Sequence, residues 1–370
     1  MKRLALFGAF LAVITGSSGH VVAETVYFAS ENVEFVATVD LPGQSAGARR
    51  YRNHFYAVTS TGLYIFDVAR PEEPELVGSL DLELDPHHLA PEDVDTNGDI
   101  LLVRGGLGSG APLLVIDVRN PADPQLVRSV ANAGDHTTSC LFRCRYAYGS
   151  GGSFVHLKNP SKARLAGNWT SGLPTGSVHD VTEVRPGIAV TASDPVQVLD
   201  ARVDPVAPRV IALGRPPPGR YMHQVMWPRR GKDRFLLAGT EKEWTGVCTD
   251  ERGSIMTFRT RGSRLRLVDE YGTDDVLPTE GGWPIGTGCG HWFDVHPDFR
   301  NGGSIAAGWY EHGVRFLSVS KAGIIGEDGY FVPVGGSTSA AYWIDDEIVY
   351  ATDYNDRGFD ILRFTRSDHG

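Results

Sequence analysis

Four histidines attract attention because they occur in similar local settings. Each begins or precedes a short, mostly apolar segment, and a glutamate takes the matching place in another segment, where Glu92-Asp-Val-Asp aligns with His179-Asp-Val-Thr. The four are His136, His179, His223 and His291. Imidazole and carboxylate groups are ligands for copper, iron, zinc and manganese ions. These residue types therefore indicate a transition-metal site, provided that the fold brings the segments together.

An internal repeat supplies the elements that must position these side chains. The segment LYIFDVARPEEPELV at 63–77 is matched position by position, 50 residues later, by LLVIDVRNPADPQLV at 113–127. Weaker copies at 154–160 and 196–208 keep a strand and a proline turn. A unit of roughly 40 to 50 residues with four short strands is typical of one blade of a β-propeller.

Assigning four strands to each unit predicts an all-β, seven-bladed propeller in a single domain, residues 24–370. The blades begin near Ala46, Pro91, His136, His179, His223, His291 and Ser339. The last unit has only three strands, so the segment 33–40 is expected to pair with the strand at 359–364 and close the ring. A β-sandwich explains the sequence less well, because sandwiches do not repeat a proline turn at blade spacing.

The first strand of each blade lines the central channel of a propeller, so the four histidines should converge there with Glu92. His88, on the loop that leads to Glu92, is a further candidate. The predicted ligands of one transition metal ion (Cu, Fe, Zn or Mn) are thus His136, His179, His223, His291, Glu92 and His88. In the alternative hypothesis, the same histidines line a water-filled channel and hydrogen-bond to the backbone.

Turns between the second and third strands should surround the mouth of this site. Among their residues, Glu243, Glu311 and His312 are candidates for general acid or base catalysis. Trp244, Trp292 and Tyr310 are candidates for apolar walls. Each of these residues could instead be an ordinary exposed loop residue.

Composition limits the possible partners. The chain has 370 residues, of which 41% are hydrophobic and 22% charged, so it can bury a large core. Forty-four glycines and 22 prolines favour short strands over long helices. The net charge of −10 disfavours binding to nucleic acid or to anionic membranes.

The N-terminus has the features of an export signal. Residues 1–23 combine a basic start, an apolar stretch and a small-residue end, which predicts cleavage after Ala23 and a secreted protein without a membrane span. An oxidising destination favours the disulfides Cys140–Cys144 and Cys248–Cys289. In a rival interpretation, Cys289 is a metal ligand beside His291.

The repeat strand, LVID at 114–117, resembles the strand that names the LVIVD-repeat family of β-propellers. Stretches such as HDVTE at 179–183 and GWYEHG at 308–313 are similar to secreted, actinobacterial-type members of that family. This resemblance implies the propeller fold over nearly the whole chain after residue 23. It implies little about activity, because a structural repeat does not determine chemistry.

Two functional classes follow. The first is a metal-dependent oxidoreductase or lyase that acts on a small or oligomeric extracellular substrate in the channel. The alternative is a non-enzymatic extracellular propeller whose loop face binds a protein or a glycan. The metal content of the purified protein distinguishes them.

Overall fold

The computed structural model describes residues 26–82, 84, 91–106, 110–174, 177–241, 253–273, 289–355 and 357–366. The predicted signal at 1–23 lies outside these ranges, as do His88, Glu243, Trp244 and Cys248. Helical structure in the described residues is limited to α1 (Pro228–Gly231) and the 3-10 turn η1 (Pro160–Lys162). No helix in these ranges has the length and apolar character needed to cross a bilayer.

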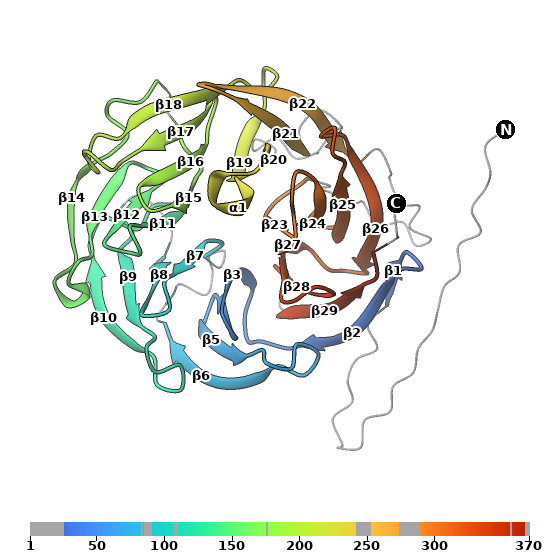
Figure 1. Cartoon of the computed structure of the whole chain (residues 1–370). Coiled ribbons are helices and arrows are strands. Elements are labelled where there is room, and N and C mark those ends of the chain that lie inside the picture. Colours follow the sequence, from blue (N-terminus) through green and yellow to red (C-terminus); the bar gives the residue numbers. More distant parts are fainter. Residues whose placement is uncertain are drawn as a thin grey trace.

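The strands form antiparallel sheets arranged around a common centre, and consecutive strands lie side by side from the centre outward (Figure 1). One sheet contains β3 (Ser45–Tyr51), β4 (His54–Thr59), β5 (Gly62–Asp67) and β6 (Glu75–Asp81). The next contains β7 (Val94–Thr96), β8 (Ile100–Arg104), β9 (Leu113–Asp117) and β10 (Gln125–Val130). It is followed by β11 (Thr138–Leu141), β12 (Tyr146–Gly149), β13 (Ser153–His156) and β14 (Arg164–Asn168).

Two further sets of four strands are joined into one eight-stranded sheet, because their outer strands β18 and β22 pair in parallel. The first set is β15 (Asp180–Arg185), β16 (Ile188–Ala192), β17 (Val196–Asp200) and β18 (Arg209–Gly214). The second is β19 (Tyr221–Met226), β20 (Phe235–Glu241), β21 (Ser254–Arg261) and β22 (Arg264–Gly272).

The remaining two sheets each include a strand from the N-terminal region. Strand β1 (Tyr27–Ala29) lies outside β23 (Phe293–Val295), β24 (Gly303–Gly308), β25 (Val314–Val319) and β26 (Ile325–Pro333). Strand β2 (Val33–Val39) completes the sheet of β27 (Thr338–Trp343), β28 (Ile348–Asp353) and β29 (Phe359–Phe364). The β2–β29 register runs antiparallel from Val33↔Phe364 to Val39↔Phe359. The predicted closure between these two segments is therefore confirmed.

The repeated proline turn has the same local structure in three sheets. An aspartate ends the third strand, and its Oδ1 accepts a hydrogen bond from the backbone N–H two residues later, which is an Asx turn. The pairs are Asp67 with Ala69 (2.7 Å), Asp117 with Arg119 (3.1 Å) and Asp200 with Arg202 (3.1 Å). The aspartate and prolines that recur in the repeat thus reflect one turn geometry that is used several times.

The hydrophobic core lies between neighbouring sheets. Phe55 of β4, for example, contacts Tyr350 of β28 and Phe359 of β29, with ring centroids 5.0 and 5.2 Å apart. Because apolar residues fill these spaces, the inner edge of the ring is left to polar side chains.

Side chains on or beside the inner strands connect one sheet to the next. Each of four acceptors takes a hydrogen bond from a backbone N–H of the following inner strand, which would otherwise lack a partner there. The pairs are Asp93 with Thr138, Asp95 with Cys140, Gln224 with Phe293 and Asp294 with Trp343, at 2.7–3.2 Å. These bonds fix the spacing of the segments that carry the candidate site.

The predicted disulfide Cys140–Cys144 is present, with the two Cα atoms 4.4 Å apart. Cys289 is also disulfide-bonded, and Cys248, its expected partner, lies outside the described residues. An oxidised Cys289 has no thiolate to offer, so the interpretation of this residue as a metal ligand is wrong.

Candidate metal centre

The four predicted histidines form an arc on the inner side of the ring. Ring centroids are 4.8 Å apart between His136 and His179, 4.0 Å between His179 and His223, and 4.2 Å between His223 and His291. We call this arc, together with Glu92 and Glu241, the His–Glu cluster.

The expectation that each histidine is the first residue of an inner strand holds only approximately. His136 and His291 lie two residues before β11 and β23, His179 directly precedes β15, and His223 is the third residue of β19. The ladder continues beyond the regular strands, since the N–H of His179 donates to Ala192 (2.8 Å) and that of His291 to Gly308 (2.9 Å). These bonds bring the rings to one level despite the different strand ends.

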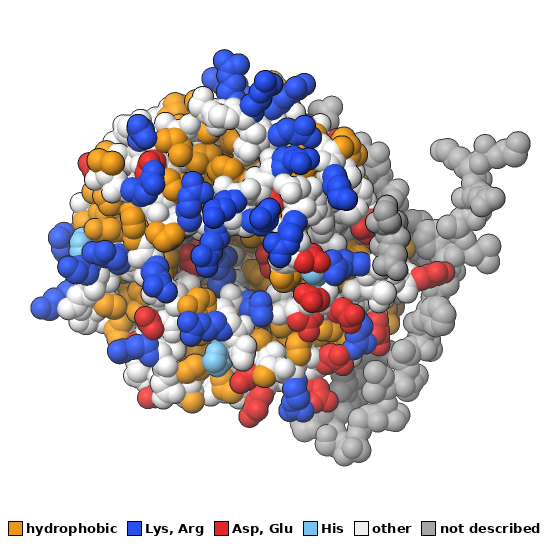
Figure 2. Space-filling model, in the orientation of Figure 1, with side chains coloured by type: hydrophobic (Ala, Val, Ile, Leu, Met, Phe, Trp, Pro, Cys, Tyr) orange, Lys and Arg blue, Asp and Glu red, His pale blue; other side chains and the backbone are white. Residues whose placement is uncertain are grey.

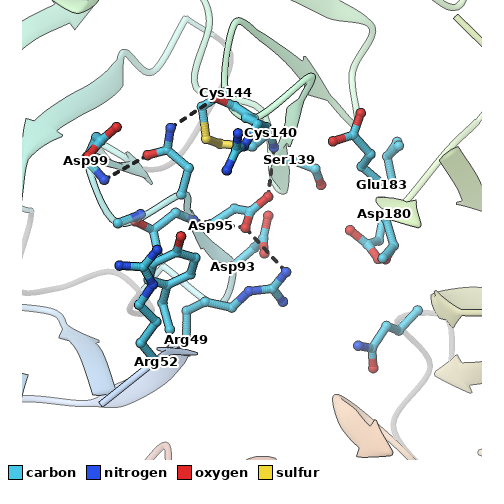
Figure 3. Close-up of a pocket in the computed structure, with 18 of the residues that line it drawn as sticks. Arg49, Arg52, Asp93, Asp95, Asp99, Ser139, Cys140, Cys144, Asp180 and Glu183 are labelled. Carbon is cyan, nitrogen blue, oxygen red and sulfur yellow. Dashed lines mark hydrogen bonds and ion pairs between the residues drawn. A yellow bond between two sulfur atoms is a disulfide. The ribbon is translucent and has the colours of Figure 1, made fainter. Parts of the chain in front are cut away.

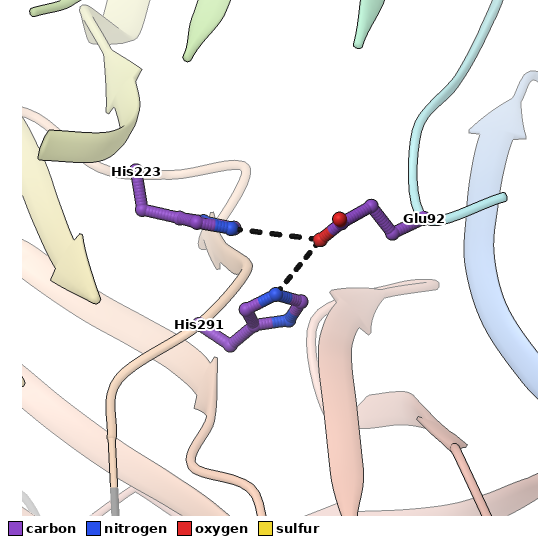
Figure 4. Close-up of side chains that lie close together, drawn as sticks. All are labelled: Glu92, His223 and His291. Atoms are coloured by element: carbon purple, nitrogen blue, oxygen red, sulfur yellow. Dashed lines mark ion pairs between the residues drawn. The ribbon is translucent and has the colours of Figure 1, made fainter. Parts of the chain in front are cut away.

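Glu92 connects three of the histidines. Its Oε1 contacts Nε2 of His136, and its Oε2 lies 2.9 Å from Nε2 of His291 and 3.5 Å from Nε2 of His223 (Figure 4). The indole N–H of Trp292 also donates to Oε2, at 3.2 Å. The alignment of Glu92 with the histidines thus identified a residue that meets them in space.

Glu241 is a second carboxylate in the cluster that the sequence analysis did not select. Its Oε2 lies 3.6 Å from Nε2 of His223, and its Oε1 accepts a hydrogen bond from the Tyr310 hydroxyl. The candidate chosen from the sequence was Glu243, two residues later, which lies outside the described residues. Strand pairing could have identified Glu241. It is the last residue of β20 and pairs with Tyr221, two residues before His223.

Backbone acceptors fix the orientation of two rings. Nδ1 of His179 lies 2.8 Å from the carbonyl oxygen of His223, and Nδ1 of His291 lies 2.7 Å from that of Ser339. A carbonyl can only accept, so both Nδ1 atoms carry a proton. In the neutral ring of His179, Nε2 then keeps a lone pair, whereas Nε2 of His291 lies against the Glu92 carboxylate and would offer a lone pair only where a cation replaces its proton. Metal-bound histidines commonly have this arrangement, with the distal nitrogen hydrogen-bonded to an acceptor.

Burial and neighbouring charges divide the histidines into two kinds. Burial, reinforced by nearby imidazoles, lowers the pKa of His223 to about 3 and that of His179 well below its ordinary value. Burial also opposes protonation of His136 and His291, but Glu92 raises the pKa of both. Burial alone would raise the pKa of Glu92, yet His136 and its neighbours hold it well below the usual range. Two rings are therefore neutral donors of lone pairs.

The geometry around His223 fits a cation. Both of its ring nitrogens are buried and have no hydrogen-bond partner in the part of the chain that the structure describes. Two ligands of a tetrahedral ion, each at about 2.0–2.2 Å, lie roughly 3.3–3.6 Å apart. The distances from His223 to Glu92 and Glu241 match this separation. Three ligand groups have donor atoms within 4.8 Å of one another: Glu92–His223–His291, Glu92–His136–His179 and His179–His223–Glu241.

The predicted catalytic residues Glu311 and His312 lie between β24 and β25 and belong to none of these ligand groups. Glu311 accepts a hydrogen bond from Ser337 at 3.4 Å. His312 is buried, and its Nδ1 has no hydrogen-bond partner within the described ranges. Burial lowers its pKa to about 4. The adjacent Tyr310 does reach the cluster, with its ring 4.7 Å from that of His291. The catalytic role of Glu311 and His312 stays a prediction.

Comparison with solved structures identifies the architecture. A β-propeller domain of Myceliophteria thermophila Cps50 (Swd1) matches with a TM-score of 0.60 at 13% identity, covering 89% of this chain and 99% of that one. The WD40 β-propeller domain of Doa1 matches with a TM-score of 0.58 at 11% identity, covering 91% and 97%. The fold is a β-propeller. A Bacteroides uniformis protein described as a candidate 6-phosphogluconolactonase matches similarly, with a TM-score of 0.59 at 13% identity, covering 83% and 87%.

These likenesses show the propeller fold alone, because the identities are low. No family model matches the chain, and no curated protein matches it. The function of this propeller therefore has to be argued from the His–Glu cluster.

Proposed function

We propose that this chain is an exported, seven-bladed propeller of the LVIVD-repeat type that binds one transition metal ion in its central channel. The ligands would come from His136, His179, His223, His291 and Glu92, with Glu241 added. His88, which lies outside the described residues, stays a candidate from the sequence. We further propose that the metal serves an oxidoreductase or lyase acting on a small or oligomeric extracellular substrate.

The observation that carries the proposal is the environment of His223. This side chain is 0% exposed and has two neighbouring imidazoles and two carboxylates around it, yet neither of its ring nitrogens has a hydrogen-bond partner among the described residues. An unsatisfied buried polar group costs free energy of about 1–3 kcal/mol. Coordination of a cation by Nε2 would satisfy that nitrogen and would offset the charge of the two carboxylates.

The cluster is open on one side. The side chain of His136 is 45% exposed, whereas those of His223 and His291 are 0% and 1% exposed. A bound metal would act as a Lewis acid or a redox centre. On the protein side, Trp292 and Tyr310 form aromatic walls, and Tyr310 holds a proton against Glu241. Glu311 and His312 remain the proposed acid–base residues.

The experiment is elemental analysis of protein produced through its export route in metal-replete medium. We expect close to one copper, iron, zinc or manganese ion per chain. The variant His223→Ala should lower that content at least tenfold, while the matched variant His54→Ala, on β4 and outside the cluster, should leave it unchanged.

A metal-free protein that also fails to bind any of these ions on titration would overturn the proposal. One observation then favours the non-enzymatic alternative: Glu92 is already paired with His136 and His291, so this part of the cluster is satisfied without a cation. The channel would be a solvated lining, and the loop face would bind a protein or glycan.

A further inference from the structure

A second polar site lies directly beside the His–Glu cluster along the channel. A cavity of about 700 Å³ has among its wall residues Asp93, Asp180, Gln224 and Trp292, each of which directly follows a cluster residue in the sequence (Figure 3). None of the cluster residues lines this cavity. Trp292 lines the cavity and also contacts the cluster, since its ring lies 4.8 Å from that of His223. The indole therefore separates two distinct environments.

Three exposed arginines line the cavity, and we call it the arginine pocket. They are Arg52, Arg143 and Arg230, located in the turns β3–β4, β11–β12 and β19–β20. None of the three has an ion-pair partner among the described residues. Figure 2 shows Lys and Arg side chains gathered around the hollow at the centre of the ring. The wall of the same cavity also holds Arg49, which is paired with Asp95, and five carboxylates, namely Asp93, Asp95, Asp99, Asp180 and Glu183. The available positive charge therefore lies at the three rim arginines and not over the whole pocket.

The backbone at these arginines argues that their side chains are needed. Their φ angles are +55°, +59° and +57° for Arg52, Arg143 and Arg230. This left-handed region favours glycine and asparagine and disfavours residues with a long side chain. Neighbouring residues such as Arg229 share this conformation, so it belongs to the turns. Three of the turns nevertheless each place an arginine on the same pocket, at a position where glycine would be less strained.

The base of the pocket offers an unsatisfied donor. Gln224 is only 7% exposed, and its Oε1 accepts the N–H of Phe293 at 2.7 Å, which fixes the orientation of the amide. Its Nε2 has no hydrogen-bond partner among the described residues. Asp93 uses Oδ2 to accept the N–H of Thr138 and has no such partner for Oδ1 in the same part of the chain. A ligand at this depth would therefore meet one free donor and one free acceptor.

We propose that the arginine pocket binds a small polyhydroxylated carboxylate, that is, a sugar acid. The arginines at the rim would bind its carboxylate, since guanidinium groups pair with carboxylates through two parallel hydrogen bonds. Its hydroxyls would accept from Gln224 and donate to Asp93, which a simple anion without hydroxyls cannot do. The volume is within the usual range of small-molecule sites. This inference goes beyond the proposed metal site and does not depend on it.

The test is calorimetric titration of the full chain, after treatment with a chelator, with sodium gluconate and sodium glucuronate at low ionic strength. Acetate and glucose serve as probes of the two halves of the ligand. We expect at least one sugar acid to bind and both half-probes to bind at least tenfold more weakly. Added salt should weaken the binding, because the rim contacts are exposed charges.

The decisive variant is the double substitution Arg143→Gly/Arg230→Gly. Glycine suits the positive φ at both positions, so the melting temperature should not fall, while the affinity for the sugar acid should fall at least tenfold. The matched control is Asn132→Gly, at another positive-φ turn outside the pocket (φ +58°), which should leave the affinity unchanged.

Absence of binding by both sugar acids, or equal affinity in the double variant, would overturn the inference. Equal binding of acetate would also overturn it, because it would reduce the pocket to a simple anion site. The metal content of the double variant should equal that of the unsubstituted protein, so failure of this inference is distinguishable from failure of the metal proposal.

Discussion

The His–Glu cluster and the arginine pocket are built from consecutive residues of the same chain segments, yet they differ in chemistry. Glu92 and His223 belong to the cluster, whereas the next residues, Asp93 and Gln224, line the pocket. The cluster holds buried imidazoles with free lone pairs, while the pocket has fixed charges and an amide donor. One step along an inner segment thus separates buried imidazoles suited to a cation from a pocket of mixed charge whose rim arginines can pair with an anion.

The largest effect is expected from a deletion that should disrupt the cluster and the pocket together. Deleting residues 26–40 takes away β1 and β2 and leaves β29 as an unpaired edge. We expect the melting temperature to fall by more than about 10 °C, because the loss of a whole strand costs several kcal/mol. Thermal melts followed by circular dichroism measure the change in melting temperature, with a chain starting at residue 26 as the control. Unchanged melting of the deletion would show that ring closure contributes little.

The inner-strand connections should contribute to the dependence of stability on pH, separately from the buried histidines. Burial raises the pKa of Asp294 from 3.8 to about 6. The native state then keeps a proton that the unfolded state releases, so the contribution of Asp294 to stability falls as pH rises from about 4 to about 6, by up to about 3 kcal/mol. The lowered pKa values of His179 and His223 act in the opposite direction, and comparison with an Asp294 variant cancels them. Asp294→Asn cannot ionise, and its stability relative to the unsubstituted protein should increase over this window.

Urea unfolding of chelator-treated protein at pH 4.5, 5.5 and 7 measures this difference. A difference in unfolding free energy that stays constant across the three pH values would contradict the assignment to Asp294.

Adjacent substitutions sharpen the comparison between the two regions. Glu92→Gln keeps an acceptor for Trp292 but removes the charge that faces three histidines, so metal affinity should fall by roughly 10- to 100-fold. Asp93→Asn should leave metal affinity nearly unchanged and weaken binding of the sugar acid. Competition with a chelator and calorimetry measure the two affinities. Equal effects of both substitutions on both ligands would show that the cluster and the pocket are a single site.

The smallest effect is expected from removal of the disulfide, which lines the arginine pocket and has no part in the His–Glu cluster. Cys140 and Cys144 close a very short loop, so the variant Cys140→Ser/Cys144→Ser should lose no more than about 2 kcal/mol of stability. Metal content should not change. Thermal melts with and without reductant measure the stability change, and a loss of metal in this variant would contradict the separation of the two regions.

Much of the fold and half of the site could be predicted from the sequence. The aspartates that end three of the repeat strands make the same Asx turn, so the repeat is visible in the residues themselves. Glu92 and the histidines were found because they occupy aligned places. Glu241 was missed because its position depends on which residue of β20 faces β19. The arginine pocket was missed because turn conformation, and not residue spacing, directs Arg52, Arg143 and Arg230 to one cavity.

The pairing of β2 with β29 also sets the order in which the molecule can be completed. Val33 and Phe364 lie far apart in the sequence, so this contact is one of the most non-local in the fold. Hairpins within each sheet can form early from local contacts, whereas ring closure has to wait until β2 and β29 meet. Until then, the partly folded chain presents two unpaired strand edges, the feature most prone to wrong pairing between molecules. Assembly is therefore most vulnerable just before the ring closes.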